Sequence, residues 1–174
     1  MSVLKDIRAH VPDCTYHVNI GLGSIKDALD QYKVNMNPEY QRDYVWTTEQ
    51  KSKFVGAALE NHNAVPPFWL NWVSKDYDRS HSEIVDGKQR ISAILDWIDG
   101  HIKAVCPCGI EVWHKDLNEV DLRCIKMAAS FDWNFVHLPQ KEVMEFYIRL
   151  NAGGTIHSED DLNKVKEMIA KTDS

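Results

Sequence analysis

The sequence predicts a single α+β domain, and three observations lead to this prediction. The chain has 174 residues, which is within the usual size of one domain and long enough to bury a core. Hydrophobic residues make up 44% and charged residues 26%, close to the average of globular proteins. Short β-like segments alternate with segments of helical periodicity, and no internal repeat, low-complexity tract or convincing linker separates them. We therefore expect residues 1–174 to form one mixed domain.

The predicted strands are short segments rich in β-branched or aromatic residues, bounded by polar turns. The stretch 35–44 is polar, contains a proline and has no periodicity, so we expect an extended loop there. A charged surface turn is expected at 75–82. The expected strands are 16–20, 68–73, 83–86 and 131–138, with a hairpin over 101–112 that turns at 107–109.

Helices are predicted where a capping residue precedes apolar residues at helical spacing. Ser24, Thr47 and Ser158 are the predicted N-caps, each with an acidic or amide residue three positions later. Gly100 is expected to end the helix that follows Gly87. The apolar residues of the predicted helices lie within 28–32, 54–59, 91–98, 143–150 and 162–169, and the pattern of 117–129 fits a short helix less clearly.

The charge of the chain restricts the class of function. The formal net charge is −6 and the pI is near 5.7, whereas proteins that coat nucleic acid are usually basic. This disfavours a simple DNA-binding module but not an enzyme that acts on nucleic acid. The first residues contain no apolar signal core, and no apolar run could span a bilayer. We therefore expect a cytoplasmic location, no membrane partner and four reduced cysteines.

The segment 83–90 is the strongest candidate for a site. A buried strand is expected to end at Asp86, Gly87 permits a tight turn, and a helix starts at once. The free N–H groups and the positive dipole end of that helix attract an anion. Lys88 and Arg90 lie in its first turn, and an arginine can grip a phosphate with two nitrogens. Asp86 could hold a metal, a ribose or a reacting hydroxyl. A charged helix cap with a surface salt bridge is the alternative.

Two further segments are weaker candidates. The loop 37–46 contains amides, an arginine, two acids and three aromatic residues, and loops of this composition often bind ligands. A solvated loop with aromatic residues tucked beneath it is the alternative. In 149–155 a helix is expected to end at a glycine pair, which explains most of that segment structurally, although Asn151 could face a ligand.

The cysteines offer poor support for a metal site. Cys106, Cys108, His114 and Cys124 could supply four zinc ligands, but structural zinc sites usually separate paired cysteines by two or more residues. We expect thiols packed in or near a hairpin and no zinc. The sequence also lacks a Walker pattern, a GxGxxG fingerprint and a recognisable nucleophile with its base.

Four motifs in the same order resemble a known family. They are the loop 37–46, the Val-Pro-Pro-Phe segment 65–68, the Asp-Gly-x-Gln-Arg turn within 84–92, and the segment 146–154 with its Arg-Leu-Asn sequence. Together they resemble the N-terminal domain of GmrSD-type modification-dependent restriction enzymes, a branch of the ParB/sulfiredoxin-like superfamily. The resemblance covers about residues 16–165 and leaves 166–174 as a C-terminal tail. It implies a ParB/sulfiredoxin-like mixed sheet flanked by helices.

The resemblance also implies a nucleotide site, because the family's Asp-Gly-Gln-Gln-Arg motif is associated with nucleotide binding and hydrolysis. This chain departs from the motif at its central position, where it has Lys88 instead of the usual glutamine, and lysine could add a phosphate contact. The expected metal is Mg²⁺, at Asp86. Carried over residue by residue, the expected catalytic residues are Asp86, Arg90 and Glu39, and the expected nucleotide-binding residues are Gln41, Arg42, Gly87, Lys88, Gln89, Arg90 and Asn151.

The leading functional hypothesis is a stand-alone domain that binds and hydrolyses an NTP in DNA restriction, phage defence or counter-defence. It is stand-alone in this hypothesis because the chain ends at Ser174 without the His-Asn-His nuclease domain of those enzymes. The implied partners are a nucleotide and DNA or a DNA-acting protein, and self-association is also implied. One alternative is a DNA nuclease or nickase of the ParB-like fold. The other is a non-enzymatic regulatory protein that uses the pocket as a switch.

Overall fold

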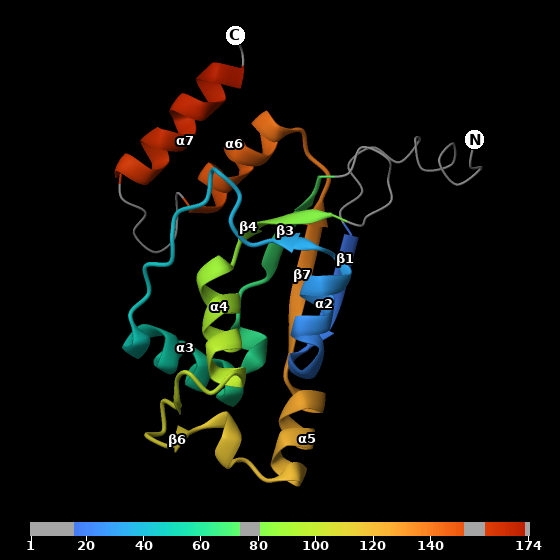
Figure 1. Cartoon of the computed structure of the whole chain (residues 1–174), viewed down its shortest axis with the longest axis vertical. Helices are drawn as coiled ribbons and strands as arrows, with labels where there is room; N and C mark the ends of the chain where they lie inside the picture. Colours follow the sequence, from blue (N-terminus) through green and yellow to red (C-terminus); the bar gives the residue numbers. More distant parts are fainter. Residues whose placement is uncertain (1–15, 74–80, 152–158, 173–174) are drawn as a thin grey trace, which may run out of the picture.

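A mixed five-stranded sheet forms the centre of the computed structural model, which describes residues 16–73, 81–151 and 159–172. The strand order across the sheet is β1-β7-β3-β4-β2 (Figure 1). β1 pairs with β7 and β3 with β4 in antiparallel fashion, whereas β3–β7 and β2–β4 are parallel pairs. The predicted α+β architecture with a mixed sheet is therefore confirmed. The strands are β1 Tyr16–Gly21, β2 Val34–Asn35, β3 Phe68–Trp72, β4 Ser82–Asp86 and β7 Ser130–Val136.

The helices lie where apolar periodicity predicts them. The segment 117–129, whose pattern was less clear, contains a helix. The expected C-terminal tail from residue 166 is wrong, because residue 166 lies inside the last helix. The helices of the described residues are α2 Ile25–Gln31, α3 Thr48–Glu60, α4 Lys88–Ile98, α5 Glu119–Ala128, α6 Gln140–Asn151 and α7 Glu159–Thr172.

Of the predicted N-cap residues that the structure describes, one makes the expected side-chain hydrogen bond and one does not. Thr47 forms the expected capping box, because its hydroxyl accepts from the Gln50 N–H and the Gln50 side chain accepts from the Thr47 N–H. Ser24 is the N-cap residue of α2 as predicted, but its side chain makes no capping hydrogen bond. A 3-10 turn over Leu22–Ser24 runs directly into α2 and supplies backbone acceptors there instead. Ser158 and the glycine pair at 153–154 lie outside the described residues, as does most of the predicted turn at 75–82.

The two faces of the sheet bury different sets of side chains. On one face, Phe68 and Leu70 of β3 join Ile84 of β4 in the larger hydrophobic core, which α2, α3 and α4 cover. On the opposite face, Val85 of β4 packs with Tyr147 of α6 in a smaller core, which α6 and α7 cover. This alternation follows from the two-residue period of a strand. β4 therefore contributes to both cores and ends between them.

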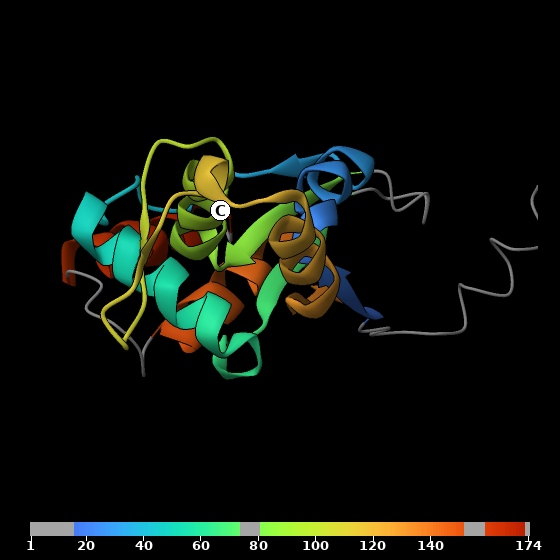
Figure 2. The same cartoon turned by 90° about the horizontal axis from the view of Figure 1, so that it is seen from below.

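A small hairpin packs against α3. Its strands are β5 Ala104–Val105 and β6 Glu111–Val112, which pair in antiparallel fashion as predicted for 101–112. Figure 2 shows the hairpin running beside α3. The close approach depends on Gly56, because a Cβ there would stand 2.1 Å from the Val105 carbonyl oxygen. The hairpin thus supports the helix that follows the 37–46 loop.

Candidate functional site

The site begins where β4 turns into α4. Gly87 is the N-cap of α4 and has a φ of 108°, a left-handed conformation that favours glycine. A Cβ at this position would lie 2.4 Å from Cδ1 of Phe68, so the turn also has no room for a side chain. The Ile91 N–H is bonded to the Gly87 carbonyl, and no side chain caps the helix. The first N–H groups of α4 are therefore presented at the end of β4.

Two glutamines attach the 37–46 loop to this turn. Nε2 of Gln41 donates to the Val85 carbonyl at 2.6 Å and to the Ile84 carbonyl at 3.2 Å. Oε1 of Gln89 accepts from the Val45 and Trp46 N–H groups at 3.1 and 3.3 Å, and its Nε2 donates to the Asp43 carbonyl at 3.0 Å. The loop is thus held over the start of α4 by side chains that complete its backbone hydrogen bonds.

Lys88 also holds the loop. The residue is only 4% exposed, and its Nζ donates to the Arg42 carbonyl at 2.8 Å and lies 4.7 Å from the centre of the Tyr44 ring. Burial lowers the pKa of the Lys88 ammonium, and the nearby Asp43 carboxylate raises it in part. The lysine that departs from the family motif therefore has its hydrogen-bonding group turned towards the loop backbone.

Arg90 is occupied in a similar way by the chain itself. Its guanidinium donates to the Pro66 carbonyl, to the Pro67 carbonyl at 3.2 Å and to Oδ2 of Asp86 at 2.6 Å. It also lies 5.0 Å from the centre of the Phe68 ring. Burial lowers the pKa of Arg90, and the Asp86 carboxylate opposes that shift. The two guanidinium nitrogens that were expected to bind a phosphate instead donate to Asp86 and to the carbonyls of Pro66 and Pro67, and so connect α4 to β4 and to the proline pair.

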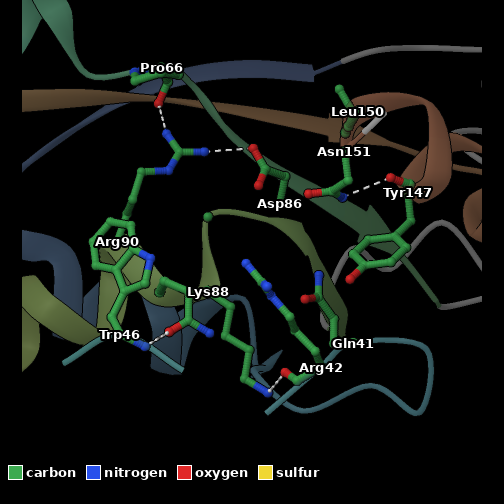
Figure 3. Close-up of a pocket in the computed structure, with 12 residues that line it drawn as sticks. Gln41, Arg42, Trp46, Pro66, Asp86, Lys88, Arg90, Tyr147, Leu150 and Asn151 are labelled. Carbon is green, nitrogen blue, oxygen red and sulfur yellow. Dashed lines mark hydrogen bonds and ion pairs between the residues drawn. The ribbon is translucent and has the colours of Figure 1, made fainter. Parts of the chain in front are cut away.

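These elements enclose a cavity of about 320 Å³ (Figure 3). Arg42 extends its guanidinium into the middle of the cavity, between the loop and the turn. Nδ2 of Asn151 donates to the Tyr147 carbonyl at 2.7 Å, and the Asn151 carboxamide oxygen is turned towards Asp86. The lining residues are Gln41, Arg42, Trp46, Pro66, Asp86, Gly87, Lys88, Gln89, Arg90, Tyr147, Leu150 and Asn151.

The structure therefore brings together every expected site residue except Glu39. Glu39 is exposed and lines a different cavity, beside Tyr40 and Glu83. The reason is local: Pro38–Gln41 form a turn in which the Gln41 N–H donates to the Pro38 carbonyl at 2.9 Å, and Glu39 lies on the exposed part of this turn, whereas the Gln41 side chain reaches the carbonyls of β4. Glu39 is accordingly not part of the arrangement around Asp86.

Sequence reasoning missed Tyr147, Trp46, Pro66 and Leu150 as pocket residues. Tyr147 lies one helical turn before Asn151, so the helical period that placed the apolar stripe of α6 could have indicated it. Pro66 contributes its backbone carbonyl to Arg90, a contact that no side-chain pattern reveals.

The cavity offers few oxygen ligands for the expected metal. Among the described residues, no group of three His, Cys, Asp or Glu side chains is placed to hold an ion. Asp86 and the Asn151 oxygen fit Mg²⁺, because this ion commonly takes one or two carboxylates and completes its shell with water and substrate phosphates. Cys106, Cys108 and Cys124 are free thiols, with Cys108 and Cys124 exposed.

Within the described ranges, no helix has both the length and the apolar character required to cross a membrane.

Comparison with the models of known protein families gives a match over most of the chain. The model of a family described as the N-terminal domain of the GmrSD restriction endonuclease matches residues 25–166. This range contains all the elements that line the cavity. No curated protein and no solved structure matches the chain.

Proposed function

Because the chain belongs to the family of GmrSD restriction endonuclease N-terminal domains, we propose that it binds a nucleoside triphosphate in the cavity at the start of α4 and hydrolyses it. Membership of this family implies a role in DNA restriction and phage defence. The mixed α+β fold is consistent with a ParB-like domain. The nucleotide, its hydrolysis and the contact with DNA are the parts that we propose.

One observation provides the main support for this proposal. The uncapped N-terminus of α4 and the Arg42 guanidinium border the same cavity. Backbone N–H groups and the positive end of the helix dipole favour an anion at such a position. An arginine adds a charge and a planar pair of donors that matches phosphate oxygens. A polyphosphate would therefore meet both kinds of donor at once.

The remaining cavity residues have distinct roles in this proposal. Lys88, Gln89 and Arg90 are positioning residues, because their polar groups hold the loop, the turn and the proline pair. Asp86 and Asn151 would hold Mg²⁺, which neutralises phosphate charge during phosphoryl transfer. Asp86 would also orient water near the phosphates. Catalysis of this kind depends on positioning and charge neutralisation rather than on a covalent nucleophile.

Binding is tested by calorimetry of the full chain with ATP, GTP, CTP and UTP in the presence of Mg²⁺, with and without DNA. We expect saturable binding of at least one nucleotide, and at least tenfold weaker binding by Arg42→Gln, because that change removes the charge inside the cavity. Arg123→Gln is the matched control, since Arg123 is exposed on α5 and does not line this cavity. Absence of binding by the wild-type protein would contradict the proposal.

A regulatory protein that binds nucleotide without turnover is the second candidate. It is favoured by the hydrogen bonds of Lys88 and Arg90 to backbone carbonyls, which commit both side chains to the protein. Phosphate release by the purified chain separates the two candidates: sustained release supports hydrolysis, and binding without release supports the switch. Nicking of supercoiled plasmid with Mg²⁺ or Mn²⁺ tests the nuclease alternative in the same preparation.

A further inference from the structure

A second and larger cavity lies at the other end of β4. Its volume is about 640 Å³, and Glu39, Asn71 and Glu83 are among the residues that line it. Tyr40 lines this cavity and Tyr147 lines the first, and their ring centres are 5.5 Å apart. Because Tyr40 and Tyr147 are both buried, this aromatic pair forms part of the wall between the two cavities. The second cavity is therefore a separate site, independent of the proposed nucleotide.

Three neighbouring strands supply polar groups to the second cavity. Asn35 of β2 and Asn71 of β3 are both register partners of Glu83 on β4, so the three side chains form a row across the sheet. Asn71 is 3% exposed, and its Nδ2 donates to Oε1 of Glu83 at 3.3 Å and to the Leu138 carbonyl at 3.2 Å. Its Oδ1 accepts from the Leu138 N–H at 2.8 Å. Asn71 thus fixes the position of the Glu83 carboxyl group.

The second cavity is suited to positive rather than negative ligands. Glu39 and Glu83 both border it, and the described residues that line it include one basic side chain, His137, but no lysine or arginine. Partial burial raises the pKa of Glu83, although hydrogen bonds from Asn71 and Tyr40 oppose the shift. A carboxylate that has lost part of its hydration gains more from a nearby cation than an exposed one does. Phosphates and other anions are repelled by the same groups.

Much of the remaining wall is apolar, although His137 and Gln140 also line it. Pro38, Leu138, Pro139 and Met168 line the second cavity beside the two carboxylates. Long basic groups bury their methylene stem along apolar surface while the charged end meets a polar partner. From this combination we propose that the second cavity binds an ammonium or guanidinium group carried on an alkyl stem, with Glu83 and Glu39 as the counter-charges. The group belongs either to a small amine or to a basic side chain of a partner protein.

Calorimetry of the full chain with Nα-acetylarginine amide tests the proposal, and Nα-acetylcitrulline amide is its neutral counterpart of nearly equal shape. We expect saturable binding of the arginine compound and at least tenfold weaker binding of the citrulline compound. A short peptide with one internal arginine distinguishes the sources: tighter binding of the peptide than of the amide indicates a protein partner, and equal binding indicates a small amine. Equal affinity for arginine and citrulline compounds, or no binding of either, overturns the proposal.

Variants locate the binding to this cavity. Glu83→Gln and Glu39→Gln are each expected to weaken binding of the arginine compound at least fivefold. Glu39 is exposed, so its variant keeps the fold even if the change at Glu83 disturbs it. Glu111→Gln is the control, because Glu111 is an exposed residue of β6 that pairs with Lys103. Unchanged affinity in the Glu39 and Glu83 variants would contradict the assignment. Neither probe is a nucleotide, so the result is independent of the first cavity.

Discussion

At the scale of single residues, the turn at Gly87 is the position at which sequence and geometry agree most closely. Its left-handed φ of 108° and the 2.4 Å approach of a Cβ to the Phe68 ring each require glycine. The consequence extends to the site, because the same turn determines where the first N–H groups of α4 point.

Gly87→Ala is expected to destabilise the protein substantially. The left-handed backbone costs an alanine about 1–2 kcal/mol, and the clash with Phe68 adds about 1–3 kcal/mol of overpacking. Gly100→Ala is a matched control, because Gly100 also has a positive φ, of 75°, but a Cβ there would meet nothing within 4 Å. The free energy of unfolding in urea measures both variants. Equal losses at the two positions would show that the Phe68 contact is unimportant.

The charged residues near Gly87 show the limit of reasoning from residue type. Lys88 and Arg90 were expected to meet phosphate, yet each donates to backbone carbonyls of the chain. Residue type predicts that a group is a cation and a donor, but its partner depends on which carbonyls the fold places nearby. Arg42 carries the charge that extends into the cavity (Figure 3).

At the scale of elements, the start of α3 is a predicted feature that also supports the site. The capping box at Thr47 ends the loop that Gln89 and Lys88 hold over α4. A cap of this type satisfies N–H groups that the first turn of a helix cannot bond internally. The loop is therefore held by its contacts with α4 and by its junction with α3.

Thr47→Ala is expected to lower the free energy of unfolding by about 1 kcal/mol, because it removes the acceptor for the Gln50 N–H. Thr48→Ala provides the control at the adjacent exposed residue, which is the first residue of α3 rather than its cap. Chemical denaturation gives the stabilities, and hydrogen exchange of the 41–47 amides reports on the loop. We expect faster exchange in Thr47→Ala than in Thr48→Ala, and the opposite order would contradict the role of the cap.

At the scale of the whole molecule, β4 links the two cores and the two cavities. Asp86 lines the first cavity and Glu83 the second, and both carboxylates belong to this one strand. The two groups have different environments. Asp86 is paired with Arg90, whereas the hydrogen-bonding partners of Glu83 are the neutral side chains of Asn71 and Tyr40.

The raised pKa of Glu83 predicts a pH dependence of stability. A carboxyl group whose pKa is higher in the folded state stabilises the fold most below its unfolded pKa, and that contribution is lost as the pH rises through the folded value. Glu83→Gln, which cannot ionise, should therefore become more stable relative to the wild type as the pH increases from 4 to 7. The groups that share the second cavity with Glu83 include its hydrogen-bonding partners Asn71 and Tyr40, its register partner Asn35, His137 and the exposed Glu39.

Urea denaturation at several pH values measures this difference. The same series with Glu111→Gln reports the effect of removing an exposed carboxylate from the surface. A difference between Glu83→Gln and the wild type that stays constant across the range, or changes in the opposite direction, would contradict the inferred environment of Glu83.

The sequence by itself determined the order and approximate bounds of most elements, the capping box at Thr47 and the turn at Gly87. These features depend on residues close together in the chain, through periodicity, capping and backbone conformation. The family motifs in the sequence also predicted most of the residues that line the first cavity. They did not predict that Lys88 and Arg90 donate to backbone carbonyls of the chain.

Only the tertiary structure decided that Glu39 lies apart from Asp86, that Arg90 joins the proline pair, and that Glu83 stands between two asparagines in a second cavity. Each of these results depends on how the 37–46 loop crosses β4 and on which strands are neighbours. Such contacts join residues far apart in the sequence, and local patterns carry no information about their geometry.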